Sequence, residues 1–226
     1  MKRSVSLGLI LLMVIPRNAL SPPSTAKQSG YSKLNLTEEV QKYTKSYISA
    51  NIVDFSLKDK TVNGELPSLT ARAGKLAYGN GCEKRLYATT NECSDLYMFY
   101  IYNGISTPFN LTINITLSYR GRRNDTFLVD INDASYIYWN PDNITMYPAD
   151  TTNYSEEKCN FTCEVFFHGT FAYEVTEVKN DKPNKGLEGI GRVSYINDRK
   201  LVYNGDLDLA YNISGVFLHA MTCNNK

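Results

Sequence analysis

The hydrophobic pattern of this chain changes twice along its length. Near the N-terminus, Val5 to Ile15 form a short apolar run behind the basic residues Lys2 and Arg3. Apolar side chains then recur at helical spacing over about 38–50. From about residue 95, apolar and polar residues alternate with period two, and β-branched and aromatic residues dominate. The pattern predicts one short helix followed by a long β-rich region.

The clearest predicted strand runs from Pro108 to Tyr119. Its apolar side chains all fall on one face: Leu111, Ile113, Ile115 and Leu117. Asn110 and Asn114 fall on the opposite, polar face, and each begins an Asn-X-Thr triplet. A glycan requires an exposed asparagine, so the polar face of this strand is expected to lie in solvent.

Several further segments show the same alternation: Phe127–Ile131, Cys163–Phe167, Phe171–Val175 and Leu207–Tyr211. Tyr97–Tyr102 and Gly215–Thr222 are apolar on both faces and are typical of central strands. Turn-forming clusters separate these segments, and the glycine cluster 186–191 is expected to be a hairpin turn. We therefore predict a mainly β fold, an antiparallel β-sandwich or barrel with one short N-terminal helix.

The N-terminal segment is typical of a secretory signal peptide. A basic start, a short apolar run and small residues after Pro16 are its three parts. A membrane-spanning helix needs about 20 apolar residues, roughly twice the length of this run. We expect a signal peptide over 1–24 with cleavage between 20 and 26, and a secreted chain without a membrane anchor.

The domain boundaries follow from composition. Residues 25–36 are rich in small and polar residues and predict a flexible leader. Thr37 is the expected N-cap of the helix, because Glu38 and Glu39 follow where the helix dipole favours acids. A single β-rich domain is expected over 37–226.

Secretion gives meaning to the glycosylation triplets and to the cysteines. The chain carries eight predicted N-glycosylation sites: Asn35, Asn110, Asn114, Asn124, Asn143, Asn153, Asn160 and Asn212. The five cysteines are disulfide candidates: Cys82, Cys93, Cys159, Cys163 and Cys223. Two bridges would leave one cysteine, either buried or joined to a second chain, so a monomer and a disulfide-linked dimer both remain open.

The candidate chemistry does not favour an enzyme. His168 and His219 lie on predicted strands and outside any nucleophile motif. The recurring acids Asp130, Asp133, Asp206 and Asp208 could suggest a glycosidase, but alternating acids are typical of solvated strand edges. The spacing of Cys159 and Cys163 has no second pair to complete a zinc site. We expect no catalytic residues, no metal and no cofactor, and the nearly neutral charge suggests no nucleic-acid partner.

The aromatic residues suggest a binding role. Tyr136 and Tyr138 fall on one face of a predicted strand, and Ile137 and Trp139 fall on the other. Exposed Tyr and Trp beside Asn and Asp suit recognition of a protein or a sugar. We take Tyr136, Tyr138 and Trp139 as a candidate recognition surface. The alternative is that both faces are buried between layers.

The layout of the chain resembles the p36 immunosuppressant glycoproteins of tick saliva. The resemblance rests on the secreted leader, the tyrosine-rich strands after Cys93, the glycosylation sites between Asn110 and Asn160, and the late Cys223. It implies a salivary protein that binds a host protein or cell-surface target and suppresses the host immune response. It supplies no functional residues.

A tick salivary lipocalin is the alternative, a barrel that sequesters a small amine or lipid. The classes make different structural predictions. A protein binder requires an exposed patch over a filled core, and a carrier requires an internal pocket of several hundred Å³ or more. A hydrolase requires a cleft in which His168 or His219 meets a Ser or Asp.

Overall fold

The computed structural model describes residues 31–59, 61, 64–82, 93–119, 123–140, 153–179, 182–196 and 200–223. The expected signal peptide, residues 25–30 of the expected leader and the site at Asn143 lie outside this part of the chain. Asn153 lies in a described strand, although its side chain is not described. Within the described residues, no helix is long and apolar enough to cross a membrane.

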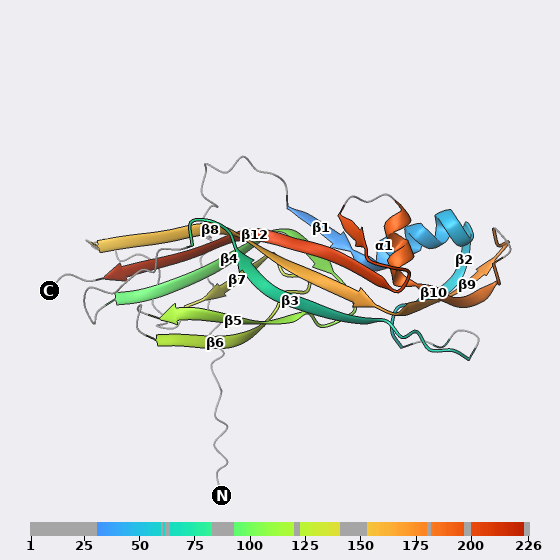
Figure 1. The fold of residues 1–226 in the computed structure, drawn as a ribbon, viewed down its shortest axis with the longest axis horizontal. Coiled ribbons are helices and arrows are strands. Elements are labelled where there is room, and N and C mark those ends of the chain that lie inside the picture. The colour runs from blue at the N-terminus through green and yellow to red at the C-terminus, as the bar shows by residue number, and fades with distance from the viewer. Residues whose placement is uncertain are drawn as a thin grey trace, which may run out of the picture.

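A long sheet forms the body of the elongated molecule (Figure 1). Its strand order is β1 (Ser32–Asn35), β4 (Cys93–Ser106), β12 (Asp208–Cys223), β8 (Asn153–His168) and β3 (Thr70–Tyr78). All of these pairs are antiparallel except β1 with β4. Two short strands complete the sheet, β7 (Tyr136–Trp139) on β4 and β11 (Leu201–Tyr203) on β12.

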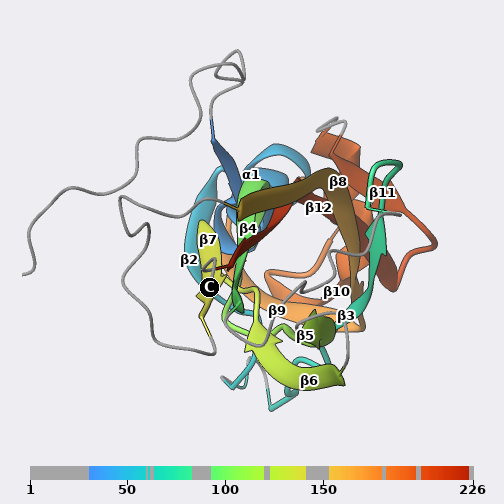
Figure 2. The same ribbon diagram turned by 90° about the vertical axis from the view of Figure 1, so that its left-hand side faces the viewer.

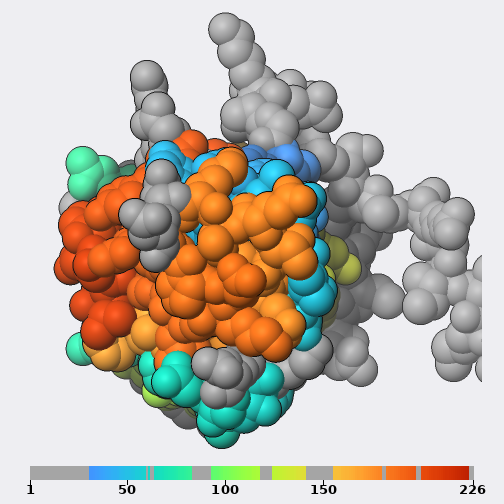
Figure 3. Space-filling view, turned by 90° about the vertical axis from the view of Figure 1, so that its right-hand side faces the viewer, coloured from blue at the N-terminus to red at the C-terminus, as the bar shows by residue number. Residues whose placement is uncertain are grey.

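Two smaller sheets enclose the core against the long one. β5 (Thr112–Tyr119) and β6 (Arg123–Asp130) form a hairpin that lies across the interior from β8 and β12 (Figure 2). β2 (Asn51–Ser56), β9 (Thr170–Thr176) and β10 (Lys185–Gly189) form a sheet at the other end. Figure 3 shows this end, where the orange surface of residues near 165–195 borders the blue N-terminal elements. The predicted β-sandwich is confirmed, and none of the three sheets closes on itself within the described residues.

The period-two pattern sets which face each strand buries. The four apolar residues of β5 and the preceding turn are at most 5% exposed, while Asn110 and Asn114 are exposed. On β8, Cys163, Val165 and Phe167 are buried and their polar neighbours point outward. The predicted strand orientation is therefore confirmed. β4 and β12, predicted as central, lie side by side within the long sheet.

The helix is shorter than predicted and begins earlier. α1 spans Leu36–Tyr43, and a π-helical turn (η1) continues it over Thr44–Ile48. Its N-cap is Asn35, whose side-chain oxygen accepts from the backbone N–H groups of Thr37 and Glu38 at 3.0 and 3.4 Å. The assignment of Thr37 as N-cap was wrong because Leu36 is fully buried and belongs to the helix. The leader also ends earlier than expected, because residues 32–35 form β1.

Two local predictions are wrong because tertiary contacts determine the conformation of these segments. The glycine cluster 186–191 is not a hairpin turn; it forms the end of β10 and the start of a 3-10 helix, η2 (Ile190–Ile196). Gly191 must be glycine because an added Cβ would lie 1.8 Å from the carbonyl oxygen of Gly205. Leu207, predicted to face inward, is 43% exposed and precedes β12.

Candidate functional site

β7 holds two tyrosines on the outer face of the long sheet. It pairs with β4 in register, with Tyr136 opposite Tyr100 and Tyr138 opposite Met98. Tyr136 is 68% exposed and Tyr138 is 43% exposed. One of the two faces of this strand is therefore open to solvent, and the two predicted recognition tyrosines lie on it together.

The third predicted residue, Trp139, faces the other way. Its ring centroid lies 5.2 Å from that of Tyr97 and 5.0 Å from that of Phe127, so it packs between β4 and β6. Ile137 also packs against the core. Trp139 therefore anchors β7 in the sandwich and is not part of the exposed surface.

The surface is larger than the sequence suggested. Four more residues extend it along β4 and toward β1: Tyr31, Met98, Tyr100 and Tyr102. The Tyr100 hydroxyl donates to the Met98 sulfur at 2.9 Å, and the ring of the exposed Tyr31 packs edge-on against Tyr102 at 5.7 Å. We call these four residues, with Tyr136 and Tyr138, the tyrosine surface. The clue in the sequence was the spacing of Met98, Tyr100 and Tyr102 by two, but only strand pairing brings them beside β7.

The hydroxyl groups of this surface are suited to hydrogen bonding. Burial and the neighbouring Tyr31 raise the pKa of Tyr102 further above physiological pH, where a tyrosine hydroxyl is already protonated. The hydroxyl of Tyr138 accepts from the side-chain amide of Asn140 at 3.1 Å. Apolar rings with polar tips on a firmly anchored strand are the chemistry of a protein-recognition surface.

The predicted glycosylation sites surround the sheets. Asn110, Asn114, Asn124, Asn160 and Asn212 are exposed. Asn35 is half-buried, and its amide nitrogen donates to Glu38 at 3.1 Å. Asn160 is opposite Val216, which is opposite Tyr100, so this site lies two strands away from the tyrosine surface on the same face.

Four of the five cysteines form disulfides. Cys82 pairs with Cys159 and Cys93 pairs with Cys223. Cys163 is buried and unpaired, and burial raises the pKa of its thiol to about 11. The prediction of disulfides is thus confirmed. Because Cys163 is buried, its thiol is not accessible to a cysteine of a second chain in the folded protein. Cys159 and Cys163 lie four residues apart on β8, so both side chains fall on its inner face.

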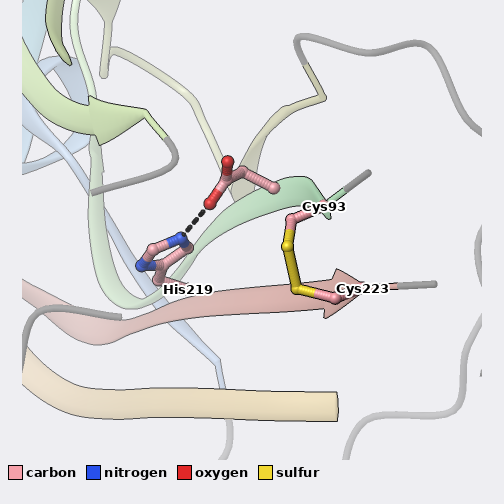
Figure 4. The surroundings of a disulfide bond; sticks show 4 residues. Cys93, His219 and Cys223 are labelled. Atoms are coloured by element: carbon pink, nitrogen blue, oxygen red, sulfur yellow. Dashed lines mark hydrogen bonds and ion pairs between the residues drawn. A yellow bond between two sulfur atoms is a disulfide. The ribbon is translucent and has the colours of Figure 1, made fainter. Parts of the chain in front are cut away.

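Both histidines meet an aspartate, at opposite ends of the long sheet. His168 Nδ1 lies 2.8 Å from Asp208 Oδ1 on the exposed outer face. His219 Nε2 lies 2.7 Å from Asp95 Oδ1 on the buried inner face, near the Cys93–Cys223 bridge (Figure 4). No hydrogen bond joins either imidazole to a serine hydroxyl within the described residues, so neither pair completes a triad there.

The acids considered for glycosidase chemistry have structural contacts. Asp130 accepts from the backbone of Leu111 and Asn132, and Asp208 pairs with His168. Lys33 lowers the pKa of Asp133, and Arg192 lowers the pKa of Asp206. A general acid requires a raised pKa, so these two shifts run against such a role.

Around Phe99 and Phe161, side chains fill the space between the sheets. A cavity lined by Phe99, Ile115, Phe161 and other apolar residues of the two layers measures only about 10 Å³. This volume is about the minimum that one water molecule occupies. Among the described residues, this cavity therefore has no room for a small-molecule ligand.

Comparison with known proteins identifies no family. No protein-family model matches the chain, and no curated protein matches it. Among solved structures, one is the Cry23Aa1 and Cry37Aa1 binary protein complex, at 9% identity and TM-score 0.47, covering 84% of this chain and 85% of the other. A non-toxic crystal protein from Bacillus thuringiensis matches at 10% identity and TM-score 0.40, covering 85% and 94%. The β-pore-forming protein Mpp75Aa1.1 from Brevibacillus laterosporus matches at 14% identity and TM-score 0.29, covering 76% and 68%. Similarities this weak carry no inference about function.

Proposed function

We propose that this protein is a secreted glycoprotein that binds a protein target through the tyrosine surface, without catalysing a reaction. The exposed pair Tyr136 and Tyr138, held on a strand anchored by Trp139, is the observation that carries the proposal. Tyrosine contributes a large contact area at low entropic cost and is enriched among residues that dominate binding energy.

The extracellular setting is supported by three features. The N-terminal pattern is typical of a signal peptide, eight N-glycosylation triplets follow it, and the chain carries two disulfides. Disulfides of this kind persist in oxidising compartments. The predicted glycan at Asn160 would lie beside the tyrosine surface and would limit the size of the partner that fits there.

The resemblance to p36 proteins suggests a more specific form of this proposal. The target would be a host protein or a receptor on host lymphocytes, and binding would suppress the immune response. The lipocalin-like carrier of a small amine or lipid remains the alternative function. The filled interior around Phe99 and Phe161 favours the binder over that carrier.

The test is binding of the labelled, glycosylated protein to host lymphocytes, measured by flow cytometry alongside proliferation. Tyr136→Ser with Tyr138→Ser should weaken binding at least 30-fold, the range expected when residues that dominate an interface are lost. Leu128→Ser is the matched control, because Leu128 is 65% exposed on β6, outside the tyrosine surface. Equal binding by the double variant and the unaltered protein would refute the proposal.

A further inference from the structure

Three strand ends meet in a pocket far from the tyrosine surface. Thr70 begins β3, His168 ends β8 and Asp208 begins β12, and they lie opposite one another in a single row. They line a pocket of about 460 Å³ together with Arg72, Phe166 and Asn204. In Figure 1 this is where the arrowhead of β8 ends beside the start of β3. The volume lies within the usual range for small-ligand sites.

Arg72 gives the pocket a positively charged group. Its guanidinium carbon lies 4.1 Å from the centre of the Phe166 ring, directly across the β3–β8 pair. No carboxylate pairs with Arg72 among the described residues. Stacking on a ring holds the guanidinium plane in place while its N–H groups at the edge remain open, and these match the two oxygens of a carboxylate.

The other groups are held in fixed positions beside this cation. The Asp208 carboxylate accepts from the Nδ1–H group of His168 at 2.8 Å, which leaves His168 Nε2 for a ligand. The Thr70 hydroxyl donates to the His168 carbonyl at 3.2 Å. Backbone bonds at 3.1 Å join Asn204 N–H to Asp208 O and Asp208 N–H to Gly205 O. These bonds fix the turn that carries the Asn204 side chain.

We propose that this pocket binds an acidic sugar, such as the acidic terminal residue of a glycan. Arg72 would hold the carboxylate, and His168, Asp208 and Asn204 would bind the hydroxyl groups through one imidazole nitrogen, one carboxylate and one amide. A site for a simple anion would not place a carboxylate within reach of the ligand, whereas Asp208 is suited to accept from sugar hydroxyls. The site is separate from the tyrosine surface and goes beyond the proposed function.

Titration calorimetry of the full secreted chain tests this site, with N-acetylneuraminic acid and glucuronic acid as probes. Galactose and glucose serve as neutral probes, and acetate serves as the simple anion. The protein's own N-glycans are trimmed first, because the predicted glycan at Asn212 would lie near the pocket. Asn212 is two positions along β12 from Ala210, on the same face, and Ala210 is opposite the pocket residue Phe166. We expect millimolar binding of at least one acidic sugar, and binding at least ten-fold weaker for acetate and for the neutral sugars.

Arg72→Ala should weaken acidic-sugar binding at least ten-fold, and Arg72→Lys should restore part of it. Asn204→Ala tests the contacts with the sugar hydroxyls. It should weaken binding of the acidic sugar and should not strengthen binding of acetate. Lys75→Ala is the matched control, an exposed cation on the same strand that does not line the pocket. Tyr136→Ser with Tyr138→Ser should leave sugar binding unchanged, which separates this test from that of the proposed function. The proposal fails if neither acidic sugar binds at a concentration about 50 times the expected dissociation constant of about 1 mM. It also fails if acetate binds as tightly as the acidic sugars, or if Arg72→Ala leaves their affinity unchanged.

Discussion

The Nε2 atom of His219 and the Oδ1 atom of Asp95 lie 2.7 Å apart, and neither side chain is more than 5% exposed. Figure 4 shows the imidazole on the inner side of β12, beside the Cys93–Cys223 bridge. The ring of Tyr97 stacks on the imidazole with centroids 4.3 Å apart, and a carboxylate oxygen of Glu157 lies 4.0 Å from Nδ1. One imidazole thus lies between two acids in the buried interior of the sandwich.

This buried pair should contribute far more to stability than the exposed pair. Asp95→Asn removes a charge-assisted bond where water cannot replace it, and we expect a loss of about 3 kcal/mol in the free energy of unfolding. Asp208→Asn breaks the same kind of pair at 50–64% exposure, where a loss below about 1 kcal/mol is expected. Urea denaturation of the two variants measures the contrast. Equal losses would mean that burial does not increase the contribution of the His219–Asp95 pair to the free energy of unfolding.

Glu157 should make the protein less stable as pH rises. Burial raises the pKa of its carboxyl group, and His219 offsets part of this rise. Its Oε1 atom is buried and has no hydrogen-bond partner among the residues that the structure describes. A raised pKa means that the folded chain holds the proton more tightly than the unfolded chain. The resulting penalty is absent below the unfolded pKa of about 4.3 and develops as pH rises through the folded pKa.

The corresponding variant is Glu157→Gln. It should raise the melting temperature by a few degrees at neutral pH, with the gain shrinking toward about pH 4 as the wild-type carboxyl becomes protonated. Calorimetric scans across this range provide the measurement, and Glu164→Gln is the control on the exposed face of the same strand. A gain that does not vary with pH would show that the ionised carboxylate is not the cause.

The two disulfides should each contribute strongly. They close loops of 77 and 130 residues, and the chain-entropy relation gives about 4 to 5 kcal/mol for loops of this length. Replacing both cysteines of either bridge by serine should lower the free energy of unfolding by this order. Denaturation under oxidising conditions tests it, with the other bridge intact in each variant. A loss below about 1 kcal/mol for either bridge would contradict the view that the bridge stabilises the fold by restricting the unfolded chain.

Cys163 should be unreactive in the folded protein. Its thiol is 1% exposed and its pKa is raised to about 11, so almost none is thiolate at neutral pH. Iodoacetamide at pH 8 should leave the native chain unlabelled and should modify one cysteine after denaturation without reductant. Rapid labelling of the native chain would show that β8 opens locally.

The alternation of polar and apolar residues determined much of this fold. In Pro108–Tyr119 it identified the buried face correctly, because side chains on a strand alternate strictly between two faces. The apolar character of Tyr97–Tyr102 and Gly215–Thr222 likewise indicated the central strands. The alternation within residues 136–139 correctly separated Tyr136 and Tyr138 from Ile137 and Trp139. Each of these patterns is local, and the sequence carries it in full.

Contacts between distant segments decided the rest. The sequence could not choose among the cysteine pairings, because pairing depends on which strand ends lie together. It also could not bring Met98 and Tyr100 beside β7, or join His168 to Asp208 and Arg72 to Phe166, since these contacts follow from strand order and register. The helix start at Leu36 depended on a burial site that only the packed core provides. The sequence by itself determined which faces are apolar, and the tertiary structure decided which faces meet, because one pattern of alternation is compatible with many strand orders.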